Sequence, residues 1–267
     1  MRSSSSAARA TDAVLRELLY ALAGFLRTFG QLQLFFLRLV AATPRAIWRR
    51  FPLVVQQVHN TGALSLPIII TSAFFVGGVL GLQGYDNLSR FGSEDALGVF
   101  VALSLMKELG PVVTALLFSG RAGTALASEI GLMRATDQLS AMEMMAVDPI
   151  RRVVMPRFLG GVIAMPLLAG IFSAVGIFGA YMVGVVLMGV DIGAFWAQMR
   201  ESVELADIME GVVKSVVFGV AASLLAVFEG YNALPTAEGV GRATTRTVVI
   251  SSIAVLVLDF MITAALM

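Results

Sequence analysis

The 267-residue chain is rich in hydrophobic residues and poor in charge. Hydrophobic residues make up 58% of it and charged residues 14%, with a formal net charge of +1. A soluble domain is about 45–50% apolar and about 25% charged, so this composition indicates an integral membrane protein. It excludes a disordered chain and a nucleic-acid-binding protein. With no cysteine and a single histidine, His59, the chain has no disulfide or thiolate site and almost nothing for a histidine-based metal or catalytic site.

Residues 11–42 predict a long amphipathic helix. Arg16, Arg27 and Arg38 are eleven residues apart and stack on one helical face. Leucine and phenylalanine recur every three or four residues, at Leu15, Leu18, Leu22, Phe25, Phe29, Leu32, Phe36 and Leu39. This pattern suits a helix in the lipid headgroup plane, with packing on the rest of the protein as the alternative. The N-terminal residues do not have the apolar core and following cleavage site that are typical of a signal peptide. We interpret residues 1–62 as an N-terminal cytoplasmic segment with an interfacial helix, and 63–267 as the membrane domain.

Five segments are apolar and long enough to cross about 30 Å of hydrocarbon, which takes roughly 20 helical residues. They are residues 63–82, 96–118, 158–190, 211–228 and 248–267. The third is longer than one crossing needs, and Pro166 predicts a bend in it. The sequence therefore predicts an all-α membrane protein with five transmembrane helices.

The distribution of arginine predicts the orientation. The segment before the first span holds eight arginines, and the connection 119–157 holds five. On the other side, Arg90 and Arg200 are the only basic residues in the connections 83–95 and 191–210. Positively charged loops stay in the cytoplasm, so we expect a cytoplasmic N-terminus and a C-terminus outside.

Two connections have helical patterns. Residues 191–210 alternate apolar and acidic residues and predict a short amphipathic helix on the outer surface. The inner connection, 122–147, carries Glu129, Arg134, Asp137 and Glu143 at helical spacing, with methionines and a leucine on its apolar face. Methionine is frequent at adaptable docking surfaces. This inner helix either caps the bundle or is a lever for a soluble partner.

Lys107 and Glu108 lie in the middle of the second span, before Gly110 and Pro111. A charge near the bilayer centre costs roughly 2.5–3.5 kcal/mol on insertion scales, and adjacent helical residues point about 100° apart. Each therefore needs a partner elsewhere, either a buried counter-charge that fixes packing or a polar ligand. Lys214 and Asp259 are weaker candidates that could pair with each other.

Small residues and missing motifs complete the pattern. Gly77 and Gly81 form a small-xxx-small motif that permits close helix contact or a dimer. The chain has no P-loop, because no glycine is followed directly by lysine. It also lacks the signatures of membrane hydrolases. We therefore expect a non-catalytic membrane subunit with a polar intramembrane site and a docking helix.

Several ungapped motifs closely resemble the MlaE (YrbE) permease family. They are GLQGY (81–85), KELGPVVTAL (107–116), SGRAG (119–123), SEIGLMRATDQL (128–139), MEMMAVDP (142–149) and AEGVGRATTR (237–246). The likeness runs from about His59 to the C-terminus. Many relatives carry arginine where this chain has Lys107, which keeps the charge but loses the bidentate guanidinium.

The resemblance implies the permease subunit of an ABC-type phospholipid transporter in the inner membrane of a Gram-negative bacterium. Such permeases work as homodimers with two copies of a cytoplasmic P-loop ATPase, a ring of periplasmic MCE-domain proteins and often a STAS-domain protein. The system moves phospholipid between the inner membrane and a periplasmic carrier, which supports outer-membrane lipid asymmetry. The resemblance implies no cofactor in this chain, because the ATPase binds the ATP.

The motifs also suggest residue roles. Lys107 and Glu108, with Leu82 and Tyr85 nearer the outer mouth, are the expected lipid-binding residues. The expected ATPase-coupling residues Glu129, Arg134, Asp137 and Glu143 lie on one predicted helix, 129–147. Two other functions stay open: a secondary transporter that uses Lys107, Glu108 or Asp259 as a proton site, and a membrane scaffold for an MCE ring.

Overall fold

A computed structural model describes residues 24, 26–41 and 51–266 of the chain. It divides into two compact units, residues 1–44 and 45–267, which are treated separately below. In the described residues every regular element is helical and there is no strand. Residues 11–23, 25 and 42 of the predicted amphipathic helix, and the arginines at 45, 49 and 50, lie outside the described residues.

In the first unit, residues 26–41 form a helix, as part of the predicted segment 11–42. Arg27 and Arg38 are both exposed, and so are the large apolar side chains of Leu26, Leu34 and Leu37. Exposed arginine together with exposed leucine is the composition expected of a helix that lies in the headgroup region. The interfacial placement stays a prediction.

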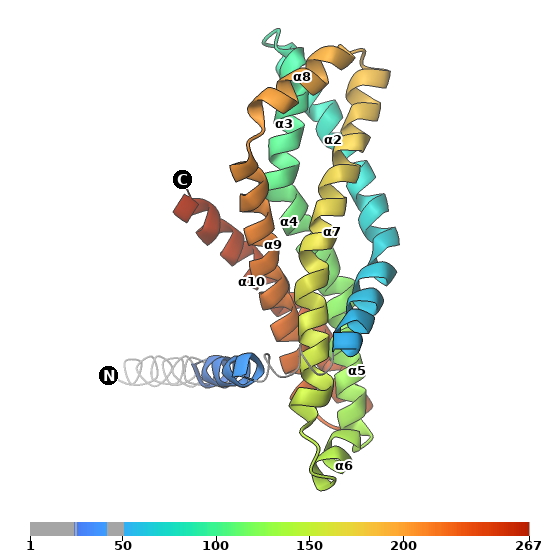
Figure 1. The fold of residues 1–267 in the computed structure, drawn as a ribbon, viewed down its shortest axis with the longest axis vertical. Coiled ribbons are helices and arrows are strands. Elements are labelled where there is room, and N and C mark those ends of the chain that lie inside the picture. Colours follow the sequence, from blue (N-terminus) through green and yellow to red (C-terminus); the bar gives the residue numbers. More distant parts are fainter. Residues whose placement is uncertain (1–23, 25, 42–50, 267) are drawn as a thin grey trace, which may run out of the picture. The chain divides into compact units, whose positions relative to one another are not determined.

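The second unit contains five helices long and apolar enough to cross a membrane, which confirms the predicted number (Figure 1). They run over Phe51–Ser89, Glu94–Ala135, Ile150–Leu187, Leu205–Tyr231 and Ala237–Leu266. All five begin before the apolar segments read from the sequence, and the first is continuous across residue 63. The second, with 42 residues, is about 63 Å long, roughly twice the hydrocarbon thickness. One end of it must therefore project out of the membrane.

The second helix changes its winding instead of breaking. It comprises α3 (Leu97–Leu103), the π-helical stretch η3 (Ser104–Leu109), α4 (Gly110–Phe118), the π-helical stretch η4 (Ser119–Gly123) and α5 (Thr124–Ala135). Pro111 lies in the first turn of α4, where its missing N–H is tolerated because the wider π turn precedes it. The helix is thus locally wider around Lys107 and Glu108.

The predicted continuous helix 129–147 is wrong. α5 ends at Ala135, and α6 (Gln138–Met144) starts after Asp137, whose φ is +57°. The hydroxyl of Thr136 donates to the Leu132 carbonyl, and Asp137 occupies the left-handed region that a short polar side chain tolerates. These two residues turn the chain, so α6 is a separate element at the tip of the bundle (Figure 1).

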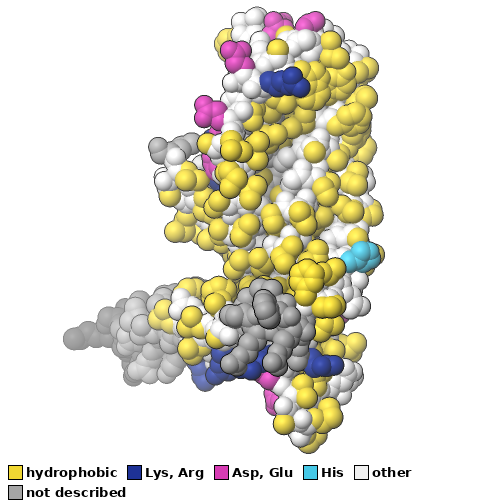
Figure 2. Space-filling model, viewed as in Figure 1, with side chains coloured by type: hydrophobic (Ala, Val, Ile, Leu, Met, Phe, Trp, Pro, Cys, Tyr) yellow, Lys and Arg dark blue, Asp and Glu magenta, His cyan; other side chains and the backbone are white. Residues whose placement is uncertain are grey.

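The placement of the predicted helix 191–210 on the outer surface stays a prediction, but the structure has a helix within it, α8 (Ile192–Ser202). It begins at Asp191, whose carboxylate accepts a hydrogen bond from the Ala194 N–H at 2.7 Å. α9 (Leu205–Tyr231) follows at once and starts with a reciprocal capping box between Glu204 and Asp207. α8 and α6 lie at opposite ends of the bundle (Figure 1). Figure 2 shows acidic side chains near the α8 end, most basic ones near the α6 end, and an apolar surface between them.

Glycines bring α2 (Leu66–Ser89) against α7 (Met155–Tyr181). A Cβ on Gly77 would lie 1.9 Å from the Gly176 carbonyl oxygen, and one on Gly179 would lie 2.3 Å from the Phe74 carbonyl oxygen. Gly81 approaches the Ala180 backbone in the same way. The small-residue motif of the first span therefore packs two helices within the chain, where only glycine allows the backbones to meet. The fifth span, α10 (Ala237–Leu266), completes the unit.

Candidate functional site: an ion-pair network at membrane depth

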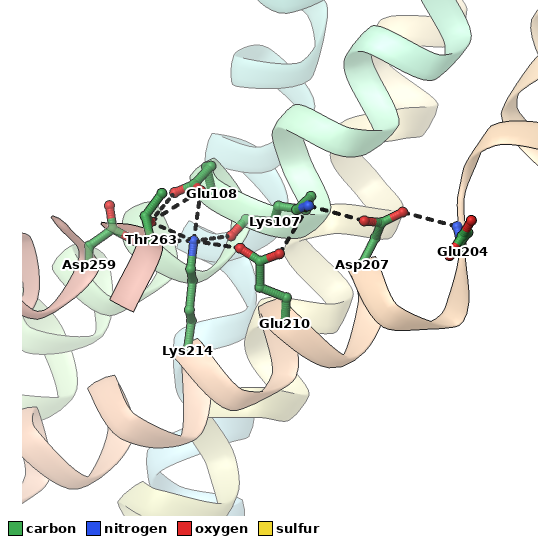
Figure 3. Close-up of polar contacts among 8 residues, drawn as sticks. All are labelled: Lys107, Glu108, Glu204, Asp207, Glu210, Lys214, Asp259 and Thr263. Atoms are coloured by element: carbon green, nitrogen blue, oxygen red, sulfur yellow. Dashed lines mark hydrogen bonds and ion pairs between the residues drawn. The ribbon is translucent and has the colours of Figure 1, made fainter. Parts of the chain in front are cut away.

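Six ionisable side chains from three helices meet inside the bundle (Figure 3). Lys107 and Glu108 come from η3, three come from α9 and one from α10; the last four are Asp207, Glu210, Lys214 and Asp259. The expectation that Lys107 and Glu108 each find a partner elsewhere is confirmed. So is the pairing of Lys214 with Asp259, at 3.9 Å.

Lys214 is the centre of this network. Its side chain has no exposed area, and its Nζ lies 2.7 Å from Glu108 Oε1 and 3.2 Å from Glu210 Oε1. The ammonium also donates to the Lys107 carbonyl oxygen at 3.1 Å and to Thr263 Oγ1 at 2.9 Å. A lysine ammonium has three donors, so these partners satisfy it fully. The buried lysine therefore joins α9 to the second span and to α10.

Lys107 forms the second half of the network. Its Nζ lies 3.1 Å from Asp207 Oδ1 and 3.0 Å from Glu210 Oε2. Glu210 thus uses one oxygen for each lysine. Asp207 also accepts from the Glu204 N–H at 3.0 Å, so the carboxylate that caps α9 belongs to the network as well. The start of α9 is therefore held to the second span by shared charges.

The network is open on one side. The Lys107 side chain is 34% exposed and that of Glu108 is 39% exposed. Lys107 is thirteen residues beyond Glu94, about 20 Å along a helix that is long and apolar enough to cross a membrane. Intramembrane charges usually face a cavity or a functional partner. The exposed edge formed by Lys107 and Glu108 can therefore be reached by a polar group from outside the chain.

Sequence reasoning missed Asp207, Glu210 and Thr263. The two acids were assigned to the outer connection, and Thr263 was read as part of an uninterrupted span. A signal was present, because Asp207, Glu210 and Lys214 are three and four residues apart and share one helical face. The acids are the counter-charges that the lysine inside an apolar span requires.

The other two predicted lipid-binding residues lie elsewhere, on α2. Leu82 is exposed, and Tyr85 is half-buried against the apolar core. In the described part of the chain, neither takes part in the ion pairs of the network. Their role stays a prediction.

The four predicted coupling residues divide into two groups. Glu129 pairs with Arg157 at 3.2 Å, and Arg134 donates to the Tyr231 carbonyl oxygen and lies 5.8 Å from the centre of its ring. These contacts tie α5 to α7 and α9. Asp137 and Glu143 are exposed, at the start of α6 and within it. The structure therefore separates anchoring charges on α5 from solvent-facing charges around α6.

The family model described as Permease MlaE matches residues 54–265. The chain belongs to the MlaE permease family. It is 54% identical, over 90% of its length and 92% of the relative's, to the intermembrane phospholipid transport system permease protein MlaE of Haemophilus influenzae. It is 39% identical, over 80% and 82%, to a probable ABC transporter permease protein of Rickettsia bellii. A chloroplast relative, the TRIGALACTOSYLDIACYLGLYCEROL 1 protein of Arabidopsis thaliana, is 29% identical over 81% of this chain and 61% of its own.

The family match covers every residue of the ion-pair network and both α5 and α6. It leaves out the helix at residues 26–41. The described part of this permease also has no group of three or more acidic or histidine side chains placed to hold a metal ion.

Proposed function

We propose that this permease is the membrane subunit of an ABC-type system that transports phospholipid between the inner membrane and a periplasmic carrier, and so supports outer-membrane lipid asymmetry. Two relatives support this: the phospholipid transport permease of Haemophilus and the probable ABC transporter permease of Rickettsia. The observation that carries it is the partly exposed ion-pair network within apolar spans. Phospholipid is a molecule that needs charged and apolar surface in one place.

The chemistry of the network fits a headgroup. Lys107 presents an ammonium to a phosphate, while the exposed apolar side chains of the spans contact the acyl chains. Leu82 and Tyr85 are proposed to line the path nearer the outer mouth. Because lysine is a point charge and arginine a planar fork, this permease would hold a phosphate with fewer geometric constraints than relatives with arginine at this position.

Energy for transport is proposed to come from a separate cytoplasmic ATPase that grips α6. Met144 and Met145 are 84% and 68% exposed beside Glu143, an adaptable apolar surface with a charge. α5 belongs to the same helix, Glu94–Ala135, that carries Lys107 and Glu108. Glu129 and Arg134 hold α5 against its neighbours. A force applied by the ATPase at α6 and Asp137 would therefore be transmitted along the continuous helix Glu94–Ala135 to the network.

The remaining partners follow from the family. We propose a homodimer in the bacterial inner membrane with two ATPase subunits, a periplasmic MCE-domain ring and a STAS-domain protein. The arginine bias supports a cytoplasmic N-terminus and α6 end, and a periplasmic C-terminus.

Reconstitution tests the proposed function. The whole complex is placed in proteoliposomes with labelled phospholipid, and transfer to the carrier is measured with and without ATP. We expect ATP-dependent transfer that Lys107→Ala and Glu108→Ala reduce. Transfer driven by an ion gradient without the ATPase would favour a secondary transporter, and transfer indifferent to both variants would favour a scaffold.

Cysteine labelling tests the orientation. Because the chain lacks cysteine, Ser93→Cys, Ser140→Cys, Gln198→Cys and Glu238→Cys each report one position. In intact spheroplasts an impermeant reagent is expected to label 93 and 198. Labelling of 140 or 238 would contradict the proposed orientation.

A further inference from the structure

A cavity of about 450 Å³ lies between α4, α7, α8 and α9. Met106, Ile177 and Met199 form its deeper wall, and Gly170 and Ala174 lie at its exposed edge. Its lining residues come from membrane-spanning helices and from α8, and α8 lies at one end of the bundle (Figure 1). Its volume falls in the range of sites that bind small ligands, about 300–1,000 Å³.

The lining offers a ligand almost no polar contact. Its two hydroxyl groups already donate to backbone carbonyls: Ser173 to Leu105 at 3.2 Å and Ser215 to Val212 at 2.7 Å. A hydroxyl has a single proton to donate, so neither is free as a donor. Water needs two to four polar partners to stay ordered in a cavity, and this lining offers few. The matching occupant is therefore a hydrocarbon.

This cavity is separate from the ion-pair network. On α9, Ile208 and Val212 line the cavity. Around the helix axis they point at least about 100° away from Asp207 and Glu210, which face the network. Between the two faces, Gly211 meets the second span so closely that a Cβ would lie 2.0 Å from the Met106 carbonyl oxygen. The backbones of Gly211 and Met106 therefore separate the network from the cavity.

A free cation lies beside the cavity. Trp196 lines it from α8, and Arg200 follows one helical turn later on the same face. Arg200 is exposed and, within the described ranges, makes no ion pair or hydrogen bond. At the same end of the bundle, Arg90 pairs with Asp86 and Lys107 pairs with two acids. Arg200 is therefore a guanidinium available to an external anion.

We propose that this cavity takes one acyl chain of a phospholipid from the surrounding leaflet, with the lipid phosphate on Arg200. The inference rests on the proposed membrane placement and lipid function, and it adds a lateral binding site outside the ion-pair network. A hollow that opens to hydrocarbon is filled by the molecule that surrounds it, and tryptophan beside a cation is typical of the membrane–water boundary. The apolar cavity and the unpaired guanidinium of Arg200 together fit one molecule that has an acyl chain and an anionic headgroup.

Photolabelling tests the site. The full-chain permease is reconstituted in phosphatidylcholine vesicles that contain phosphatidylglycerol with a diazirine on one acyl chain, and labelled peptides are mapped after irradiation. We expect adducts on α7 and α8 around the cavity. In Gly170→Phe they should fall about tenfold, because the Cβ direction of Gly170 is open and the ring would fill the cavity. Leu167→Phe adds the same ring to an exposed position on the same helix that does not line the cavity, and should label as wild type.

Arg200→Gln separates the headgroup from the chain. It should lower labelling by the phosphatidylglycerol probe and leave labelling by a diazirine diacylglycerol unchanged. Equal labelling in Gly170→Phe and wild type, or an equal effect of Arg200→Gln on both probes, would overturn the proposal. Loss of labelling on assembly of the whole complex would also overturn it, in favour of a partner's membrane helix in the cavity. If labelling behaves as expected but ATP-dependent transfer is absent, the proposed function fails while the site stands.

Discussion

Two helix contacts in this permease are built by different physics. α2 and α7 meet backbone to backbone at glycines, with no charge between them. α9 meets the second span and α10 through Lys214 and Lys107 (Figure 3). These two lysines pair with four carboxylates in all, and only Glu210 pairs with both. The first contact depends on the absence of side chains. The second combines charged side chains with one close backbone approach, that of Gly211 to Met106.

The two contacts differ in how many side-chain arrangements they allow. The glycine contact has one arrangement, because a carbonyl seated against a glycine Cα leaves no room to slide. The charged contact has several, because Lys214 has three carboxylates within 3.9 Å and Glu210 has two lysines. The ion pairs can therefore exchange partners, whereas the helix backbones, which meet at glycines in both contacts, are held in place.

The largest effect is expected at the glycine contact. Gly77→Leu would force a side chain into the Gly176 carbonyl and should cost at least about 5 kcal/mol, in the range that single substitutions reach only exceptionally. Thermal denaturation in detergent and size-exclusion chromatography would show loss of folded protein. Gly120→Ala is the control, because nothing lies within 4 Å of a Cβ there. A stable Gly77→Leu protein would show that the contact can open.

Removal of the buried cation is next. Lys214→Met leaves Glu108, Glu210 and Asp259 without their shared ammonium, and breaking a buried pair costs about 3–5 kcal/mol. Thermal unfolding measures this, with Arg90→Gln as an exposed control that should cost about 0–1 kcal/mol. Adding Glu210→Gln to Lys214→Met should restore part of the loss. No recovery would mean that packing, and not charge, holds α9.

Lys107 should affect transport more than stability. Its side chain is one-third exposed, so Lys107→Ala should cost about 1 kcal/mol or less. ATP-dependent lipid transfer should fall about tenfold or more if the exposed ammonium contacts the headgroup. Lys107→Arg should keep transfer, because the charge remains. If Lys107→Ala is strongly destabilised but its folded fraction transfers lipid normally, Lys107 acts in packing alone.

The smallest effect on stability is expected at α6. Glu143→Lys changes an exposed side chain and should shift stability by no more than about 0.5 kcal/mol. Binding of the ATPase, measured by co-purification, should nevertheless weaken. Glu94→Lys makes the same change at the opposite end of the bundle and should leave ATPase binding intact. Equal binding by both variants would remove α6 from the proposed coupling contact.

The sequence could predict the charged site only in part. Lys107, Glu108, Lys214 and Asp259 stand out because charge is rare within apolar spans. Asp207 and Glu210 did not, because they lie near the start of a span, where acids are ordinary. The helix 129–147 failed for a local reason: its composition favours a helix, but the turn at Thr136 and Asp137 depends on a left-handed residue that helical spacing does not reveal.

Composition and the lengths of the apolar segments were enough to predict the membrane class and five candidate spans, because hydrocarbon imposes length and polarity on each span independently of the others. The family could be predicted from the ungapped motifs. The sequence could not predict which charges meet, which glycines touch and where an apolar cavity lies beside Arg200. Those depend on the rotation of each helix about its axis, and that rotation is set by neighbours far away in the chain. Gly77 illustrates the division: its motif predicted a close helix contact, and the packing of α2 on α7 decided that the contact lies within the chain.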